Sequence, residues 1–219
     1  MSDESLWAEE TARIIVEGRS LYTRTQGDPF FFSSGWASPV YIDCKKLIST
    51  PEARGLLVEM ALARLAADFD ATGLDAVAGC ELTGVPFATL IADRLSKPLV
   101  LVCRQSKGFG RLAQVEGDFD PGARVLLVDD LATDGASEVV FRKALQRAEA
   151  EVVDTFVLVD FGVFPTGPSL MSLARLSDIV DCARREAMLG APELAEIERF
   201  IADPALWSRR HGGIAAPPA

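Results

Sequence analysis

The chain has 219 residues, of which 49% are hydrophobic and 25% are charged, and its formal net charge is −10. This length and apolar content are enough for a full hydrophobic core, and we expect a single domain that spans residues 1–219. The excess of acid disfavours binding to nucleic acid or to an anionic membrane, so any bound anion must meet local cations, backbone N–H groups or a metal ion.

The N-terminal sequence and the cysteines indicate a cytoplasmic protein. The first ten residues, MSDESLWAEE, are acidic and polar, unlike a signal peptide, and no apolar run approaches the roughly 20 residues that a bilayer span needs. The four cysteines contain no CxxC pair, which disfavours a zinc site or a disulfide framework and is typical of a reducing compartment. His211 is the only histidine, so mechanisms that use a histidine base or ligand are nearly excluded.

The first third of the chain contains short elements and one clear helix start. Residues 5–17 have the spacing of an amphipathic helix, and residues 30–32 and 40–43 are short β-prone runs among turn residues. Thr50 followed by Pro51 is a typical helix N-terminus. The helix that follows is expected to bury Leu56, Leu57, Met60, Ala61 and Leu65.

From residue 74 onward, strands and helices alternate. The predicted strands are nearly all apolar and cover residues 75–79, 99–103, 125–129 and 152–159, with helices from residue 86 and over 138–149. This pattern predicts a parallel sheet that is covered on both faces. After Phe161 the signal weakens to two helices, over 177–189 and 192–201. We therefore expect an α/β fold: a core over about 50–162 with a parallel sheet of about five strands flanked by helices, and a small hood from about 1–48 and 165–219.

Three loops follow the carboxyl ends of the predicted strands, at residues 80–84, 104–120 and 130–137. Ligands of parallel α/β sheets bind at this edge, so the three loops are expected to converge on one site.

The segment 124–137, RVLLVDDLATDGAS, carries the strongest chemical signal. Asp129 and Asp130 end an apolar strand, and their carboxylates are able to accept ribose hydroxyls or to hold Mg²⁺ through water. The loop that follows adds two hydroxyls and a run of N–H groups at a helix start, which suits a monophosphate. The alternative is an ordinary βα turn in which Asp134 or Ser137 caps the helix.

This segment resembles the signature of type I phosphoribosyltransferases that binds phosphoribosyl diphosphate (PRPP): an apolar strand, two acids, two variable residues, then Thr, a small residue, Gly and two small or hydroxyl residues. One departure is Asp134, where that family usually has Ala or Gly.

Three further segments resemble the branch of this family that uses orotate. Residues 34–43 resemble its base-pocket element, and residues 79–86 its pyrophosphate loop, which carries a non-proline cis peptide that we expect at Glu81–Leu82. Residues 107–117 resemble its flexible catalytic loop in the form typical of α-proteobacterial members.

The resemblance implies a pentosyltransferase of pyrimidine (UMP) biosynthesis that converts PRPP and orotate to orotidine 5′-monophosphate and diphosphate with Mg²⁺. It implies a homodimer in which the 104–117 loop reaches the neighbouring subunit. The implied catalytic residues are Lys107, Asp129 and Asp130, and the implied metal ligands, through water or substrate, are Asp129 and Asp130. The implied PRPP-binding residues are Leu82, Thr83, Arg104, Lys107, Arg111, Asp129, Asp130, Leu131, Ala132, Thr133, Asp134, Gly135, Ala136 and Ser137. The implied orotate-binding residues are Tyr41, Ile42 and Thr133.

Other departures leave two alternatives open. In an ungapped match, Cys103 stands where the family has a PRPP-binding Arg, Arg104 and Gln105 where it has lysines, and Phe109 where many members have His. Sliding the match by one residue places Arg104 on the family Arg and leaves Gln105 on the next Lys. Phe161 follows Asp160, near which some members place an Arg for the orotate carboxylate. The alternatives are a PRPP-dependent transferase for another base and a non-catalytic PRPP- or nucleotide-binding paralogue.

Overall fold

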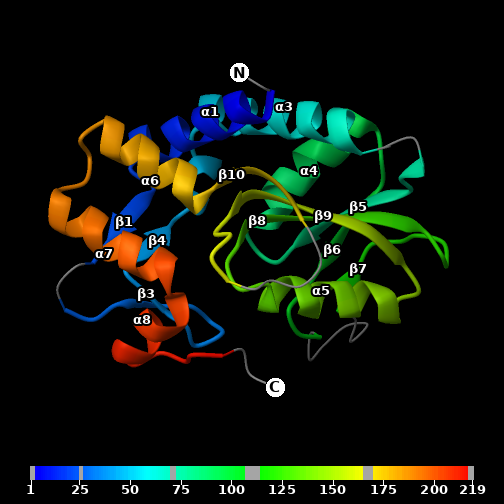
Figure 1. The fold of residues 1–219 in the computed structure, drawn as a ribbon. Helices are drawn as coiled ribbons and strands as arrows, with labels where there is room; N and C mark the ends of the chain where they lie inside the picture. Colours follow the sequence, from blue (N-terminus) through cyan, green and yellow to red (C-terminus); the bar gives the residue numbers. More distant parts are fainter. Residues whose placement is uncertain (1–2, 25–26, 70–72, 107–113, 165–169, 217–219) are drawn as a thin grey trace.

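A six-stranded sheet forms the centre of the protein (Figure 1). The computed structural model describes residues 3–24, 27–69, 73–106, 114–164 and 170–216. Within this part of the chain the strands lie in the order β10 (Met171–Arg175), β9 (Glu151–Asp160), β8 (Arg124–Ala132), β5 (Ala76–Cys80), β6 (Leu99–Val102) and β7 (Val115–Glu116). All neighbours are parallel except β7, which pairs antiparallel with β6. The predicted α/β fold with a mainly parallel sheet is confirmed, although the sequence pattern did not reveal β10.

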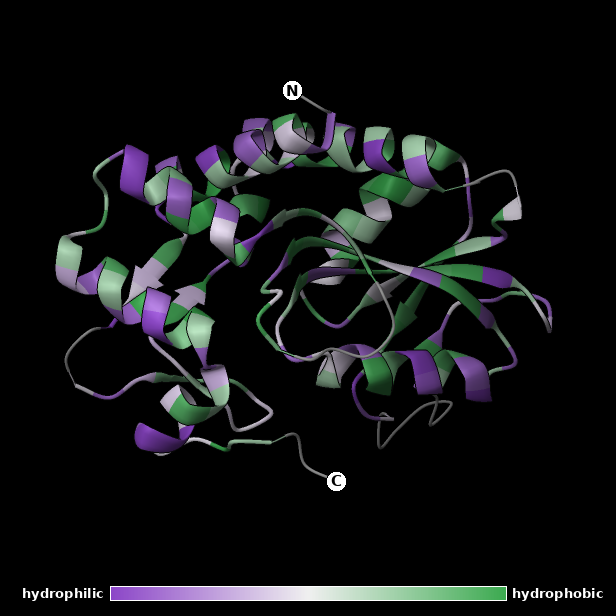
Figure 2. Cartoon of the chain, in the orientation of Figure 1, coloured by the Kyte–Doolittle hydropathy of each residue, from purple (hydrophilic) through white to green (hydrophobic). Residues whose placement is uncertain are grey.

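Helices cover both faces of this sheet (Figure 1). The helices α1 (Asp3–Glu17), α3 (Pro51–Asp68) and α4 (Gly84–Leu95) lie on one face, and α5 (Ala136–Arg147) lies on the other. Successive residues of β8 alternate between these faces, as a pleated strand requires: Leu126 belongs to the first hydrophobic cluster and Leu127 to the second. Figure 2 shows largely hydrophobic strands at the centre of the sheet and helices along which hydrophobic and hydrophilic residues alternate.

The helix starts predicted near residues 5 and 51 are confirmed, but one expected core residue is not. α3 begins at Pro51 after Thr50, and Leu57, Ala61 and Leu65 are buried as expected, while Met60 is partly buried. Leu56 is 48% exposed, so its predicted burial is wrong. Val58, two residues further along the helix, is buried instead, because a helix can turn only one stripe toward the sheet. No described helix is both long and apolar enough to cross a membrane.

The hood stands beside the sheet and combines the two ends of the chain (Figure 1). Its helices are α2 (Lys45–Ile48), α6 (Leu176–Arg185), α7 (Ala191–Ala202) and α8 (Pro204–Arg210), and its strand pairs are β1 (Leu21–Thr23) with β4 (Val40–Ile42) and β2 (Phe30–Phe31) with β3 (Ala37–Ser38). Aromatic contacts join the hood to the sheet. Phe32 meets Phe161 edge-on, with ring centroids 5.5 Å apart. The ring centroids of Trp36 and Phe164 are 4.6 Å apart. The C-terminal segment assigned to the hood also supplies β10 to the main sheet.

The C-terminal tail, by which we mean the end of α8 and the residues after it, 208–214, holds the turn between β2 and β3. The Ile214 N–H donates to the Gly35 carbonyl at 3.0 Å, and the Ala37 N–H donates to Ser208 Oγ at 2.9 Å. Ser208 Oγ in turn donates to the Ile214 carbonyl at 2.6 Å. Because Phe32 and Ser33 lead into this turn, the tail fixes a part of the hood that faces the sheet.

The start of α4 lies unusually close to β8. A Cβ atom on Gly84 would lie 2.5 Å from the Val128 carbonyl oxygen and 2.9 Å from Asp129 Cα. Both are backbone atoms, which cannot move aside without disturbing the sheet. Gly84 therefore permits α4 to pack against the part of β8 that carries the acidic pair.

We expect Gly84→Ala to lower the free energy of unfolding by about 1–3 kcal/mol, because the added methyl overpacks a backbone contact. Gly55→Ala is the matched control: Gly55 is exposed within α3 and an added Cβ meets nothing within 4 Å. That change is expected to stabilise by about 0.5–1 kcal/mol through helix propensity. Urea unfolding of both variants measures the difference, and equal stability of Gly84→Ala and the parent chain would contradict the packing argument.

Candidate active site

A cavity of about 420 Å³ lies between the hood and the carboxyl ends of the sheet strands. It brings together ten residues that the sequence assigned to the site: Tyr41, Ile42, Leu82, Thr83, Arg104, Asp129, Asp130, Leu131, Thr133 and Ser137. Four other assigned residues, Ala132, Asp134, Gly135 and Ala136, are not among the lining residues. Lys107, Phe109 and Arg111 lie outside the described residues. The three loops thus converge at one edge of the sheet.

The acidic pair lies within a strand and not at its end. β8 was predicted to stop at Asp129, but it continues to Ala132, so the expected loop start at Asp130 is wrong. The reason is the long neighbour β9, whose backbone pairs with this stretch: Asp129 is in register with Val157, and Ala132 with Asp160. The sheet ladder therefore fixes the backbone beneath both carboxylates.

The two carboxylates share a buried, poorly solvated environment. Asp129 is 7% exposed, and its Oδ1 accepts a hydrogen bond from the Asp130 N–H at 2.9 Å. Burial and the neighbouring Asp130 raise the pKa of Asp129 well above its usual range. Burial also raises the pKa of Asp130, while hydrogen bonds and the charge of Lys45 oppose that rise. Such a pair favours a bound cation, a shared proton or hydroxyl donors.

The loop after β8 turns sharply into α5. Gly135 is the N-cap residue and has φ 77°, a left-handed conformation that glycine adopts readily. The Asp134 side chain folds back on this turn: its Oδ1 accepts from the Ala136 N–H at 3.4 Å and from Thr133 Oγ1 at 3.3 Å. Asp134 therefore stabilises the helix start, as the alternative interpretation of this loop expected, although the N-cap position itself belongs to Gly135.

Arg104 connects the three loops. Its backbone N–H donates to Glu81 Oε2 at 3.0 Å, and its guanidinium donates to Ser137 Oγ at 2.7 Å. The guanidinium also lies 5.9 Å from the centre of the Phe141 ring. These contacts place a fixed positive charge beside the first turn of α5.

The loop after β5 has the backbone geometry expected from the sequence. The peptide bond between Glu81 and Leu82 is cis, so this prediction is confirmed. The side chain of Leu82 is 75% exposed, and Thr83 is the N-cap residue of α4.

Several lining residues were not among the predicted site residues: Phe31, Phe32, Ser33, Asp43, Cys44 and Lys45. Most belong to runs that were predicted as strands or turns of the hood. Lys45 follows the predicted strand 40–43 by two residues, and this proximity to a proposed base-pocket element was the available signal.

Glu138 was also missed. It lies in the first turn of α5, is 6% exposed, and its Oε1 has no hydrogen-bond partner among the described residues. Burial, and secondarily the charges of Asp134 and Asp130, raise the pKa of Glu138 to about 7. An acid in a first helical turn is normally exposed and favourable, so the sequence offered no signal of this burial.

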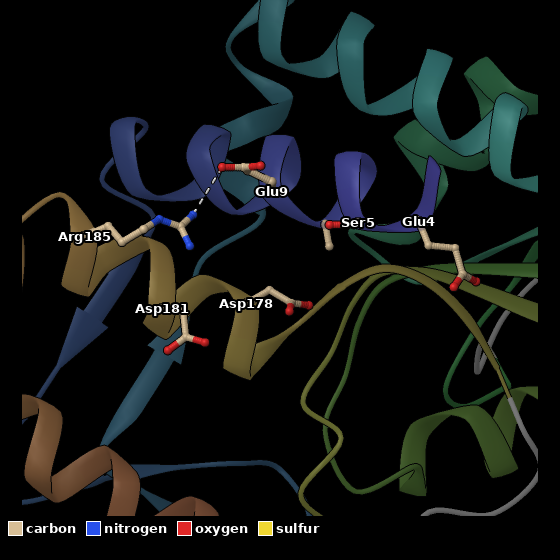
Figure 3. Close-up of a pocket in the computed structure, with 7 residues that line it drawn as sticks. Glu4, Ser5, Glu9, Asp178, Asp181 and Arg185 are labelled. Atoms are coloured by element: carbon tan, nitrogen blue, oxygen red, sulfur yellow. Dashed lines mark ion pairs between the residues drawn. The ribbon is translucent and has the colours of Figure 1, made fainter. Parts of the chain in front are cut away.

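A second hollow, between α1 and α6, does not qualify as an active site (Figure 3). It is lined mainly by acidic side chains, and these already have ion-pair or hydrogen-bond partners within the protein. Glu9 pairs with Arg185 at 3.5 Å, Asp181 pairs with Arg184 at 2.7 Å, and Asp178 accepts the Arg175 N–H at 2.7 Å. None of the predicted site residues lines it.

We expect Glu138→Gln to change the pH dependence of stability. The folded pKa of about 7 exceeds the ordinary value of 4.5, so folding favours the neutral acid and stability falls as the pH rises from 4.5 to 7. The neutral amide does not titrate, and the variant should be more stable than the parent by about 2 kcal/mol at pH 8. Urea unfolding at pH 5 and pH 8 measures this gain, which should shrink at pH 5.

Glu52→Gln is the control for this experiment, since Glu52 also occupies a first helical turn but is exposed. Its effect should stay within about 0.5 kcal/mol at both pH values. A gain of equal size for both variants, or no gain for Glu138→Gln at pH 8, would refute the assignment of a raised pKa.

Comparisons with known proteins agree with this geometry. Residues 53–163 match the family model of the phosphoribosyl transferase domain. The chain is 37% identical to an orotate phosphoribosyltransferase of Jannaschia sp. (strain CCS1), over 96% of this chain and 95% of that protein. Among solved structures, it is similar to an orotate phosphoribosyltransferase from Aeropyrum pernix, with a TM-score of 0.66, 32% identity, and coverage of 82% of this chain and 99% of that one.

A more distant likeness supports the fold alone. The structure of Leishmania donovani UMP synthase matches with a TM-score of 0.74 at 24% identity, covering 89% of this chain but only 42% of that longer protein. The near full-length identity to the bacterial relative, the matched domain and the shared architecture lead to one conclusion. The chain belongs to the orotate phosphoribosyltransferase family of proteins with a phosphoribosyl transferase domain.

Proposed function

We propose that this protein is a cytoplasmic orotate phosphoribosyltransferase of pyrimidine biosynthesis. It transfers the phosphoribosyl group of PRPP to orotate, producing orotidine 5′-monophosphate and diphosphate. The observation that carries the proposal is the single cavity in which the acidic pair, the Glu81–Thr83 loop, the first turn of α5 and the hood residues Tyr41 and Ile42 meet. The family membership of the chain supports the same reaction.

The ribose and its 5′-phosphate are assigned to the sheet side of the cavity. Asp129 and Asp130 accept the ribose hydroxyls, since two acceptors side by side match a vicinal diol. Thr133, Ser137 and the backbone N–H groups at the start of α5 hold the 5′-phosphate, where the helix dipole favours an anion. Arg104, bound to Ser137 at 2.7 Å, adds positive charge beside that phosphate.

The diphosphate is assigned to Leu82 and Thr83 and to cations of the 104–117 loop. Lys107 and Arg111 neutralise the charge that develops as the diphosphate leaves. The protein acts as a homodimer in which this loop enters the neighbouring subunit's cavity. Closure of a loop over the reactants excludes water and strengthens these electrostatic interactions.

The acidic pair also fits Mg²⁺. Carboxylate oxygens are its preferred ligands, and a cation offsets the burial that raises the pKa values of Asp129 and Asp130, together with the repulsion by Asp130 that adds to it at Asp129. The described residues contain no cluster of three or more acidic, His or Cys side chains able to enclose a metal, so substrate oxygens and water complete the coordination. When bound, the ion supplies positive charge near the diphosphate of PRPP.

The base is assigned to the hood side, against Tyr41 and Ile42, with Thr133 opposite. Catalysis then consists of orienting the base toward the anomeric carbon and of stabilising a transition state with oxocarbenium character. No histidine base or nucleophile is needed, in keeping with the single histidine of the chain, which lies in the C-terminal segment.

We expect turnover of orotate with PRPP and Mg²⁺, and a loss of about 100-fold or more in kcat for Lys107→Ala, because one charge that stabilises the leaving group is removed. Lys143→Ala, at an exposed position of α5, is the control and should keep parental activity. Spectrophotometric orotate consumption measures both. PRPP binding without turnover would favour a non-catalytic paralogue, and turnover only with another base would favour a different transferase.

The proposed exchange of loops between subunits gives a separate test. Lys107→Ala and Asp130→Asn should each be nearly inactive alone. Mixed and reassembled, they should recover about a quarter of the parental activity, because each mixed dimer holds one intact site. The Lys143→Ala chain replaces Lys107→Ala in the control mixture. No recovery in a mixture shown to exchange subunits would mean that Lys107 acts within its own subunit.

A further inference from the structure

We infer that Lys45 is the residue that binds the carboxylate of the base substrate. This inference rests on the proposed function and deepens it, because it names how the cavity recognises orotate in place of an uncharged pyrimidine. The two ligands share a planar ring, and only orotate carries a carboxylate.

The charges around the cavity favour such a residue. Four carboxylates line it, those of Asp43, Glu81, Asp129 and Asp130. An anionic base entering this environment is repelled unless a cation faces it. Among the described residues that line the cavity, Arg104 and Lys45 are the only cations.

These two cations belong to opposite sides of the cavity. Arg104 is held beside the first turn of α5 by its hydrogen bond to Ser137, on the side assigned to the phosphate. Lys45 is the first residue of α2 and belongs to the hood, which also supplies Phe31, Phe32 and Tyr41 to the lining. Flat aromatic side chains are the natural contacts of a planar pyrimidine. The base and Lys45 therefore share one wall.

The backbone of Lys45 is anchored, and its side chain is available to bind a ligand. Its backbone N–H donates to Asp43 Oδ1 at 3.2 Å, which anchors the start of α2. Its side chain is exposed, and its charge lowers the pKa of Asp130 across the cavity, against the larger effect of burial. Within the described part of the chain, no carboxylate lies within ion-pair distance of its ammonium group.

The position directly after β9 carries no charge in this chain. Phe161 directly follows β9 and is 1% exposed. It packs edge-on against Phe32, with ring centroids 5.5 Å apart, and so supports the aromatic wall without contributing charge. The counter-charge of the carboxylate must then come from another element.

The neighbouring Lys46 provides a matched control. It is adjacent in sequence and also exposed, but its ammonium group donates to the Arg19 carbonyl at 2.6 Å and lies 5.5 Å from the Tyr22 ring centre. It does not line the cavity. The two lysines therefore carry the same charge, but only the side chain of Lys45 lines the cavity.

Steady-state kinetics of Lys45→Gln, Lys45→Arg and Lys46→Gln test the inference. For Lys45→Gln we expect the KM for orotate to rise about 10- to 100-fold, the loss typical of one charge-assisted hydrogen bond, with the KM for PRPP within about twofold of the parent. Lys45→Arg should recover most of the affinity, and Lys46→Gln should match the parent. Lys45→Gln, a change at an exposed position, should remain folded at the assay temperature, which its unfolding midpoint checks.

Uracil, which has the same ring without the carboxylate, separates charge recognition from ring packing. Its inhibition constant should be equal in the parent and in Lys45→Gln. An unchanged KM for orotate, a rise confined to PRPP, or an equal loss of uracil binding would each overturn the assignment of Lys45. A parent enzyme with no orotate turnover would instead refute the proposed function, and the two failures are therefore distinguishable.

Discussion

Two adjacent carboxylates within a buried strand form the constraint around which this protein is arranged. Asp129 and Asp130 lie where desolvation opposes the charge of both carboxylates, and at Asp129 repulsion by Asp130 adds to this effect. The backbone beneath them cannot relax, because β9 pairs with it as far as Ala132. Buried negative charge of this kind needs positive charge or hydrogen-bond donors nearby. Here these come from the cations around the cavity and from the ligands proposed to enter it.

The surrounding elements keep this strand segment accessible on one side and packed on the others. α4 approaches β8 so closely at Gly84 that no side chain fits between them. The hood covers the other side of the cavity, where Phe32 contacts Phe161. Ser208 and Ile214, near the C-terminus, hold the hood turn between β2 and β3 in place. The cavity is thus bounded by parts of the chain that are far apart in sequence, and its cations, Arg104 and Lys45, come from different walls.

Much of the architecture could be predicted from local patterns. The apolar strands 125–129 and 152–159 and the Thr50–Pro51 helix start follow from short-range physical chemistry, and the structure confirms them. β10 escaped prediction because its sequence, MSLAR, is short and has only three apolar residues. It becomes a strand by pairing with β9, a partner that no local window contains. The predicted burial of Leu56 was wrong for a related reason, since the sequence of a helix with apolar residues on several sides does not reveal which stripe will face the sheet.

The same division holds for the site. The sequence by itself determined the chemical groups: the acidic pair, the Thr–Asp–Gly turn and the basic residues after β6, because each is a contiguous motif with its own local chemistry. The cis peptide at Glu81–Leu82 was expected only from the resemblance of its loop to the family. Only the tertiary structure decided that Asp134 folds back onto the start of α5, that Glu138 is buried, and that Lys45 faces the acidic pair from the hood. Burial and electrostatic coupling depend on which distant segments pack together, and that information is not contained in the spacing of residues along the chain.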